Sequence, residues 1–174
     1  MKKFLLPIEC LKDKFEDFNL IKQIILPQLN PSKSPHPTIS ELDWDNSGDF
    51  NRPWVKDILP HLSYNLTKLI KRLNYSNILI ENVWYQKYNT QSYHGWHIHS
   101  GHYTGVLYLE YPKETPPTQL IFNNEIISID ATEGDLIIFP SIVVHRSPIN
   151  ESQLQKTIIS FNFRVGLDIE NFPL

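Results

Sequence analysis

The spacing of hydrophobic residues divides the chain into a helical N-terminal part and a strand-rich C-terminal part. Between residues 15 and 29, apolar side chains recur at helical spacing, which predicts an amphipathic helix. A second helix is predicted from about residue 53 to residue 73, where the same period returns. Pro60 lies inside this second helix and should kink or split it, because proline lacks the amide hydrogen of an interior helix position.

After Asn74 the helical period stops, and short runs rich in β-branched and aromatic residues follow. Turn residues separate these runs, a pattern typical of a sandwich or small barrel. Residues 1–6 predict a further strand rather than a secretion signal, because Pro7 and Glu9 interrupt the apolar run and no small-residue cleavage site follows. The other predicted strands are residues 78–88, 103–111, 119–122, 126–129, 135–139, 142–145 and 157–165.

The pattern predicts a single domain over residues 1–174. Residues 1–76 would form an N-terminal part with a strand, helices and a long loop, and residues 77–167 the β-rich core. The loop at residues 30–52 is a candidate lid over a site in the core. A chain of 174 residues can bury roughly two-thirds of its unfolded surface, so it needs neither a disulfide nor a metal to fold. Any bound metal is therefore free to serve chemistry.

Composition and charge exclude several classes of partner. The net charge of -3 gives no electrostatic reason to expect nucleic acid or an anionic membrane as a partner. No segment approaches the roughly 20 apolar residues that a membrane span needs. The single cysteine, Cys10, excludes an internal disulfide and suits a reducing compartment, so we expect a cytoplasmic protein. A β-rich core has strand edges, one of which could pair in a homodimer.

Four of the seven histidines fall within nine residues, and this cluster is the main chemical feature of the sequence. Residues two apart in an extended chain point to the same side, so His97 and His99 can present two imidazoles to one metal ion. His145, which follows a predicted strand and turn, is the candidate for a third ligand. Spacing alone leaves an ordinary surface or core role open for each histidine. His36 and His61 have no chemical neighbours in sequence and are interpreted as structural. The four clustered histidines are His94, His97, His99 and His102.

Three sequence blocks carry a resemblance to a known family. They are residues 96–99 followed by 103–109, residues 133–141 leading to His145, and residues 156–162. In this order they resemble the 2-oxoglutarate and Fe(II)-dependent dioxygenases. The prolyl-hydroxylase-like branch and the small oxygenases of bacteria and phages are the most similar. The resemblance implies a mainly β fold with N-terminal helices, built on a double-stranded β-helix core of the jelly-roll, cupin-like type.

The resemblance also implies a metal centre and its cofactors. Fe(II) would be held by His97, His99 and His145, with 2-oxoglutarate as co-substrate and O2 as oxidant. The family usually has Asp or Glu where this chain has His99, and the small-oxygenase branch resembles it in having histidine there. Three neutral imidazoles leave the identity of the metal less determined, because imidazole suits Fe, Zn, Cu and Ni.

A cationic side chain is expected to bind the distal carboxylate of 2-oxoglutarate. The family commonly uses arginine, and Lys156 stands at that place, where it supplies charge without the bidentate geometry of arginine. Arg164 shares a side of the same predicted strand, and Arg146 follows the metal-binding position, so both stay open as alternatives. Further candidates for co-substrate binding are Tyr108, Tyr88 and Ser160. Candidates to contact the metal ligands are His94, His102 and Asn162.

The resemblance implies oxidative decarboxylation of 2-oxoglutarate to succinate and CO2, coupled to hydroxylation of a second substrate. A peptide or protein side chain is one candidate substrate. No catalytic residue beyond the metal ligands is predicted. Two alternatives stay open: a three-histidine cupin-type dioxygenase that does not use 2-oxoglutarate, and a non-catalytic metal-binding β-barrel protein. Candidates to line the pocket are Trp84, Trp96, Tyr93, Tyr103 and Phe122.

Overall fold

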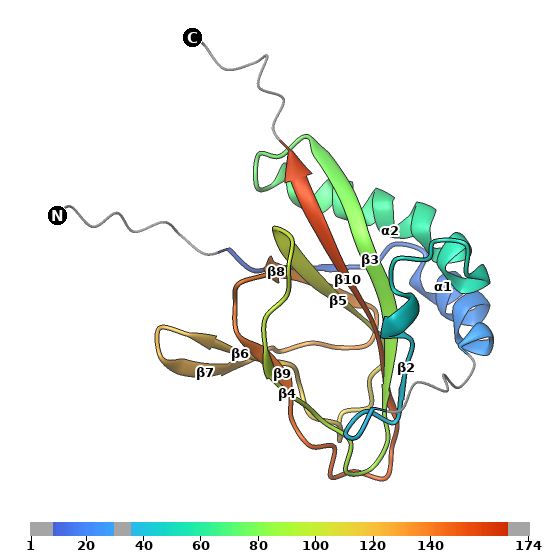
Figure 1. Cartoon of the computed structure of the whole chain (residues 1–174), viewed down its shortest axis with the longest axis vertical. Coiled ribbons are helices and arrows are strands. Elements are labelled where there is room, and N and C mark those ends of the chain that lie inside the picture. The colour runs from blue at the N-terminus through green and yellow to red at the C-terminus, as the bar shows by residue number, and fades with distance from the viewer. Residues whose placement is uncertain (1–8, 30–35, 167–174) are drawn as a thin grey trace, which may run out of the picture.

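The computed structural model describes residues 9–29 and 36–166. This part of the chain is mostly β, with two α-helices and two antiparallel sheets (Figure 1). The strand predicted at residues 1–6 lies outside the described residues. Within the described ranges, no helix is both long enough and apolar enough to cross a membrane.

The larger sheet has six strands in the order β1-β8-β5-β10-β3-β2, and the smaller sheet has four in the order β4-β9-β6-β7. All pairings in both sheets are antiparallel. The strands of the larger sheet are β1 (Leu11–Lys14), β2 (Glu41–Leu42), β3 (Asn77–Tyr88), β5 (Tyr103–Glu110), β8 (Asp135–Pro140) and β10 (Lys156–Gly166). Those of the smaller sheet are β4 (His94–His97), β6 (Gln119–Phe122), β7 (Glu125–Ser128) and β9 (His145–Ser147).

Helices α1 (Phe18–Ile25) and α2 (Pro53–Lys71) cover one face of the larger sheet (Figure 1). Side chains alternate along a strand, so every second residue of the central strands points toward these helices. Val83 of β3 and Phe161 of β10 are fully buried there against the apolar stripes of both helices. Each large apolar side chain buried in this layer contributes about 1.5–3 kcal/mol to folding.

The opposite face of the larger sheet turns toward the smaller sheet. A second apolar cluster lies there and includes Trp84, Tyr108 and Phe139. The same face also carries buried polar side chains, among them Gln86 of β3 and Lys156 of β10. Polar groups are costly to bury, so their presence in this interior indicates a functional site there.

Most predicted strands agree with the structure to within one residue at each end, but the strand predicted at residues 142–145 is wrong. The backbone amide of Val143 donates to Pro140 O at 2.9 Å, which makes this segment a turn, and β9 begins only at His145. Ile142, an apolar residue of the predicted strand, is 71% exposed. The pattern also missed the short strands β1 and β2. The extended chain assumed for His97 and His99 is present only in part, because β4 ends at His97.

The helix predictions need two corrections. The first helix begins at Phe18 rather than at residue 15, because the backbone amide of Phe15 donates to Gly134 O at 2.9 Å. A short 3-10 helix, η1 (Leu26–Gln28), continues it. Pro60 does not split α2, which runs unbroken to Lys71. Pro60 faces solvent, as does Lys56 one turn earlier, so water can bond to the carbonyl that proline leaves free.

Candidate metal centre and its two pockets

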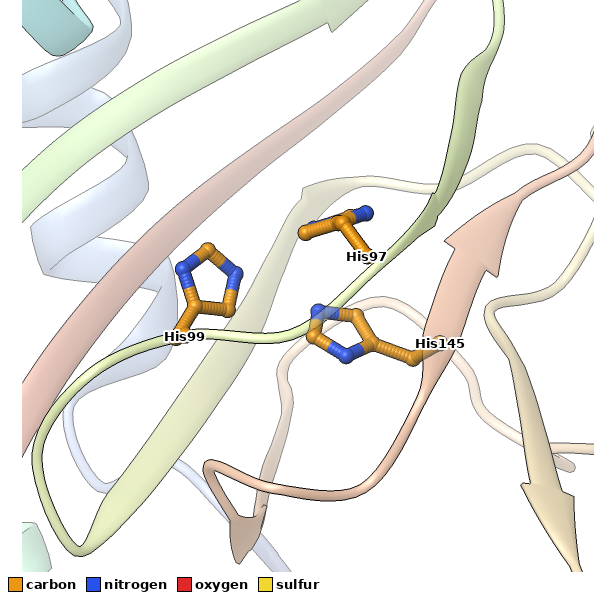
Figure 2. A group of neighbouring side chains, drawn as sticks. All are labelled: His97, His99 and His145. Atoms are coloured by element: carbon orange, nitrogen blue, oxygen red, sulfur yellow. The ribbon is translucent and has the colours of Figure 1, made fainter.

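Three histidines meet at one end of the space between the sheets. His97 ends β4 and lies opposite His145, the first residue of β9, while His99 follows β4 in the loop. One ligand-capable atom from each of the three lies within 4.8 Å of the others. Figure 2 shows the three rings gathered around a common space. The predicted grouping of these side chains is therefore present in the structure.

Hydrogen bonds to the backbone orient two of the three rings. His97 Nδ1 lies 2.7 Å from Gly95 O, and His145 Nδ1 lies 2.9 Å from Val143 O. A carbonyl can only accept, so each Nδ1 carries the hydrogen and each Nε2 keeps a free lone pair. Such a bond on the second ring nitrogen is usual for histidines that bind metals. The loop is fixed as well, because the backbone amide of His99 donates to Ser141 O at 3.0 Å.

Burial keeps these imidazoles neutral. Burial, helped by the neighbouring histidines, lowers the pKa of His99 to about 3 and that of His145 to about 4. Burial also lowers the pKa of His97. Neutral imidazole is the form that binds metals, so the three side chains are ready as ligands at neutral pH. The donor set fits Fe(II), and also Zn, Cu and Ni.

An inner pocket runs from the histidines toward β10. Its walls include Gln86, Ser147 and Ser160, and its volume of about 20 Å³ has room for about one water molecule. Entry of a larger molecule therefore requires its lining side chains to move.

Lys156 lies behind the wall of the inner pocket. Its ammonium nitrogen contacts Ser147 Oγ at 2.6 Å and Pro116 O at 3.0 Å, and lies 4.8 Å from the centre of the Tyr88 ring. The side chain is fully buried, and burial lowers its pKa to about 7. Within the described residues it forms no salt bridge, so a bound carboxylate would supply the countercharge that this cation lacks.

The two arginines considered as alternatives to Lys156 are turned elsewhere. Arg164 pairs with Glu81 at 2.7 Å and is largely exposed, because β10 has passed the edge of the smaller sheet at that point (Figure 1). Arg146 borders the inner pocket, but its guanidinium stacks 4.4 Å from the centre of the Trp96 ring and its Nε donates to Gln119. Of the three cations, only Lys156 is buried behind the pocket.

The remaining predicted co-substrate residues lie near the pocket in different ways. Tyr88 and Ser160 line it, and Ser160 Oγ donates to Gln86 Oε1 at 3.3 Å. Tyr108 is buried one layer away, where its hydroxyl donates to Thr118 Oγ1 at 2.7 Å. Burial raises the pKa of Tyr88 and Tyr108, so both stay protonated and can donate.

The predicted neighbours of the metal ligands separate into three cases. His94 stacks on His97 with ring centres 3.9 Å apart. His102 is exposed and accepts a hydrogen bond from the backbone amide of Val165, away from the cluster. Asn162 is fully buried, and within the described residues neither amide atom has a hydrogen-bond partner.

Only one of the five predicted aromatic lining residues, Trp84, lines the pockets at the histidines. Tyr103 packs on Tyr75 near the helix layer, and Phe122 borders a separate apolar groove beside β1. Trp96 and Tyr93 are partly exposed.

Sequence reasoning missed several residues of the site. Gln86 and Ser147 line the inner pocket, although alternation on β3 with Trp84 and Tyr88 could have indicated Gln86. His36, interpreted as structural, lines a second, outer pocket beside the histidines. No spacing rule relates it to them, because its position depends on how the segment before β2 folds back over β3.

Comparison with known proteins gives matches only in structure: no family model matches the chain, and no curated protein matches it in sequence. A Pseudomonas putida prolyl-4-hydroxylase aligns with TM-score 0.63 and 13% identity over 89% of this chain and 91% of that chain. An oxidoreductase of the 2OG-Fe(II) oxygenase family from Burkholderia pseudomallei aligns with TM-score 0.69 and 11% identity, covering 88% and 83%. The viral collagen prolyl hydroxylase of Paramecium Bursaria Chlorella virus-1, in its 2OG complex, aligns with TM-score 0.58 and 17% identity over 88% of this chain and 94% of that chain. The resemblance inferred from the sequence blocks is thus confirmed at the level of the fold.

Proposed function

We propose that this protein is a non-haem Fe(II) and 2-oxoglutarate-dependent dioxygenase that hydroxylates a second substrate, on a jelly-roll core. One observation carries the proposal: three neutral imidazoles converge at a pocket behind whose wall a buried lysine has no anionic partner among the described residues. The similarity in fold to 2-oxoglutarate oxygenases supports the same conclusion. Each feature alone fits other functions, but together they match a metal and a dicarboxylate.

His97, His99 and His145 would hold the metal, and Lys156 would bind the distal carboxylate of 2-oxoglutarate. When bound, Fe(II) and 2-oxoglutarate would activate O2: one oxygen atom would go to 2-oxoglutarate, which becomes succinate and CO2, and the other to a C–H bond of the second substrate, which becomes an alcohol. Three neutral ligands leave the full charge of a divalent ion uncompensated, which favours an anionic co-substrate. Ser160 and Tyr88 line the inner pocket together with the three histidines, and their hydroxyl groups could donate to the bound co-substrate.

Binding requires Lys156 to exchange its present partners for a carboxylate. Its contacts with Ser147 Oγ and Pro116 O are hydrogen bonds to neutral acceptors, which are weaker than a charge-assisted bond to a carboxylate. The exchange therefore favours the bound state once the lining side chains have moved apart. The inner pocket is enclosed by side chains, which helps to keep water out of the reaction.

The test is aerobic incubation with Fe(II), ascorbate and 2-oxoglutarate, with succinate measured as product. We expect Fe(II)-dependent succinate release from the wild type and none from His145→Ala. Zn(II)-loaded protein is the control, because zinc binds imidazole but has no redox chemistry. Succinate release that is equal with and without Fe(II) would contradict the proposal.

One observation favours a second candidate: His99 replaces the usual carboxylate, and three-histidine centres also suit dioxygenases that do not use 2-oxoglutarate. Lys156→Ala separates the two. Under our proposal it raises the concentration of 2-oxoglutarate required, whereas under the alternative it changes nothing. A purely metal-binding protein would fail both assays. The single-domain organisation, the cytoplasmic location, the homodimer and the lid at residues 30–52 stay predictions.

A further inference from the structure

The outer pocket lies beside the same histidines and is much larger than the inner one, at about 290 Å³. It shares Trp84, Gln86, His94, His97 and His99 with the inner pocket. Its other walls come from the segment around β2 and the loop after β4, and they are His36, Leu42, Trp44 and Ile98. A molecule in this space would touch the metal ligands without occupying the inner pocket.

His36 presents a hydrogen-bond donor at this outer pocket. Its Nδ1 accepts the backbone amides of Ile39 at 3.1 Å and Thr38 at 3.3 Å. A ring nitrogen that accepts two amide hydrogens carries no hydrogen itself, so the hydrogen of the neutral ring is on Nε2. The Nε2 hydrogen of His36 is therefore available to donate to a molecule in the outer pocket.

His94 offers a second donor by the same reasoning. Gln86 Oε1 accepts the hydroxyl of Ser160, which leaves the amide nitrogen of Gln86 as the donor to His94 Nδ1 at 3.4 Å. The hydrogen of His94 is then also on Nε2. The two rings meet edge to face with centres 5.7 Å apart and both line the outer pocket, so one bound molecule can contact both.

The wall that carries His36 is fixed in place. The backbone amide of Tyr93 donates to Thr38 O at 2.7 Å, and that of Ser40 donates to Lys87 O at 3.1 Å. Ser40 Oγ in turn accepts the backbone amide of Asn89 at 3.0 Å. Because the donor is positioned before any ligand arrives, its bond costs little ordering entropy.

The rest of the pocket is apolar or aromatic. Trp44 meets Trp84 edge to face with centres 4.5 Å apart, and the Ile98 side chain is exposed at the rim. Among the described residues, no acidic side chain lines this pocket. A cation would therefore find no countercharge there and would face the positive charge of a bound metal.

We infer that the outer pocket binds the primary substrate, and that the substrate is a neutral or anionic molecule whose carbonyl or carboxylate oxygen accepts the Nε2 hydrogen of His36. Its apolar part lies against Trp44 and Ile98, beside the metal ligands. That the bound molecule is a substrate rests on the proposed function. Its recognition by the outer pocket depends only on the residues that line the pocket. A free carboxylic acid and the carbonyl of a peptide share this chemistry.

Three probes with one carbon skeleton test the inference: isovaleramide, isovalerate and isopentylamine. Binding is measured by ligand-observed NMR on Zn(II)-loaded protein without 2-oxoglutarate, so the result does not depend on oxygenase activity. Repeating the measurement with Fe(II) broadens the signals of probes that bind near the metal. We expect the amide or the carboxylate to bind and the amine not to. Equal binding of all three would overturn the inference.

Two variants of His36 separate its donor from its structural role. Asparagine places its amide oxygen near the position of Nδ1, so His36→Asn keeps the bonds to Thr38 and Ile39 and loses the donor. Glutamine places its amide nitrogen near Nε2, so His36→Gln keeps the donor. We expect His36→Asn to weaken isovaleramide binding about three- to tenfold, the value of one hydrogen bond, and His36→Gln to weaken it less.

His61→Asn is the matched control, since His61 lies on α2 beside Asp17, away from both pockets. Unchanged isovaleramide binding in His36→Asn would contradict the role of His36. N-acetyl-leucine N-methylamide separates the two sources: if it binds more tightly than isovalerate, a peptide is favoured, and the reverse favours a free acid. If probes bind as expected but succinate is never formed, the proposed function fails while the pocket chemistry stands.

Discussion

The two faces of the larger sheet are built by the same strands and differ in almost every other respect. On β3 and β10, most residues that point to the helices are apolar, as with Val83 and Phe161. Residues that point to the smaller sheet include Gln86, Lys156 and Asn162, all of them buried. One face is thus packed for stability, and the other keeps polar groups that lower it.

The comparison indicates where function lies. A buried amine and a buried amide would be replaced by apolar residues if stability alone mattered, and replacing such groups is often neutral or stabilising. On the helix-covered face, the polar side chains of these strands have partners: Lys87 pairs with Glu41, and Thr157 donates to Glu110 Oε2. Variants of the two faces should therefore have opposite signatures: the inner face should govern binding, and the helix-covered face should govern folding.

The largest effect is expected for His145→Ala. Removal of one of the three proposed ligands should abolish stable iron binding and lower succinate formation about a thousandfold or more, because the two remaining imidazoles cannot hold the ion in place. Metal content by mass spectrometry and succinate assay measure this. His61→Ala should keep full iron content. Iron retained at one equivalent in His145→Ala would remove this histidine from the site.

Phe161→Ala should have the opposite signature. It leaves a cavity between the sheet and the helices, with an expected loss of about 3–5 kcal/mol in the free energy of unfolding. Urea denaturation measures the loss. Below the unfolding transition, the affinity for iron should equal that of the wild type. A loss of iron affinity without a loss of stability would reverse the assignment of the two faces.

Lys156 should make 2-oxoglutarate binding depend on pH. Its pKa in the free protein is lowered to about 7, and only the ammonium form attracts the carboxylate. As pH rises above 7 the free protein loses this proton, so Kd should rise about tenfold per pH unit until the pKa of the complex is reached. Lys156→Arg stays charged and should bind with a nearly flat profile over pH 7–9. Calorimetry at several pH values decides this.

Arg164→Ala and Arg146→Ala are the matched controls for that titration. Both should keep the pH dependence of the wild type, since Arg164 pairs with Glu81 and Arg146, although it borders the inner pocket, is held by Trp96 and Gln119. If Kd did not depend on pH in the wild type, or if Arg164→Ala removed the pH dependence, the carboxylate would be assigned to another cation.

The smallest effect is expected for Asn162→Leu. The substitution removes two buried amide atoms that lack partners among the described residues, so stability should rise by about 1 kcal/mol. Asn65→Leu is the control. The Asn65 side chain donates to His61 O and accepts the backbone amide of Glu16, so its replacement should lower stability. Thermal unfolding compares them. A destabilised Asn162→Leu would mean that this amide is satisfied.

The sequence predicted much of the fold, because strand alternation is a local signal. Strands such as β6 follow directly from runs of β-branched and aromatic residues. The turn at residues 141–144 misled the prediction, since its run of β-branched residues looks like a strand although Ile142 is exposed. Strand β1 was missed because its Lys and Asp residues suit an edge rather than a core.

The site was predicted less completely than the fold. His97, His99 and His145 could be grouped from spacing and resemblance, and the structure brings them together. Arg164 shares the strand of Lys156, but alternation does not reveal where the covering sheet ends. His36 depends on a tertiary contact with His94, which no local pattern encodes.

The most direct test of the central claim is anaerobic titration of the Fe(II)-loaded protein with 2-oxoglutarate, followed by visible absorption. Chelation of the metal by the co-substrate should produce a weak metal-to-ligand charge-transfer band that saturates at one equivalent. The band should be absent in His145→Ala and retained in His99→Asp, which keeps three ligands. Protein that holds one equivalent of iron but gives no band and binds no 2-oxoglutarate would contradict the account.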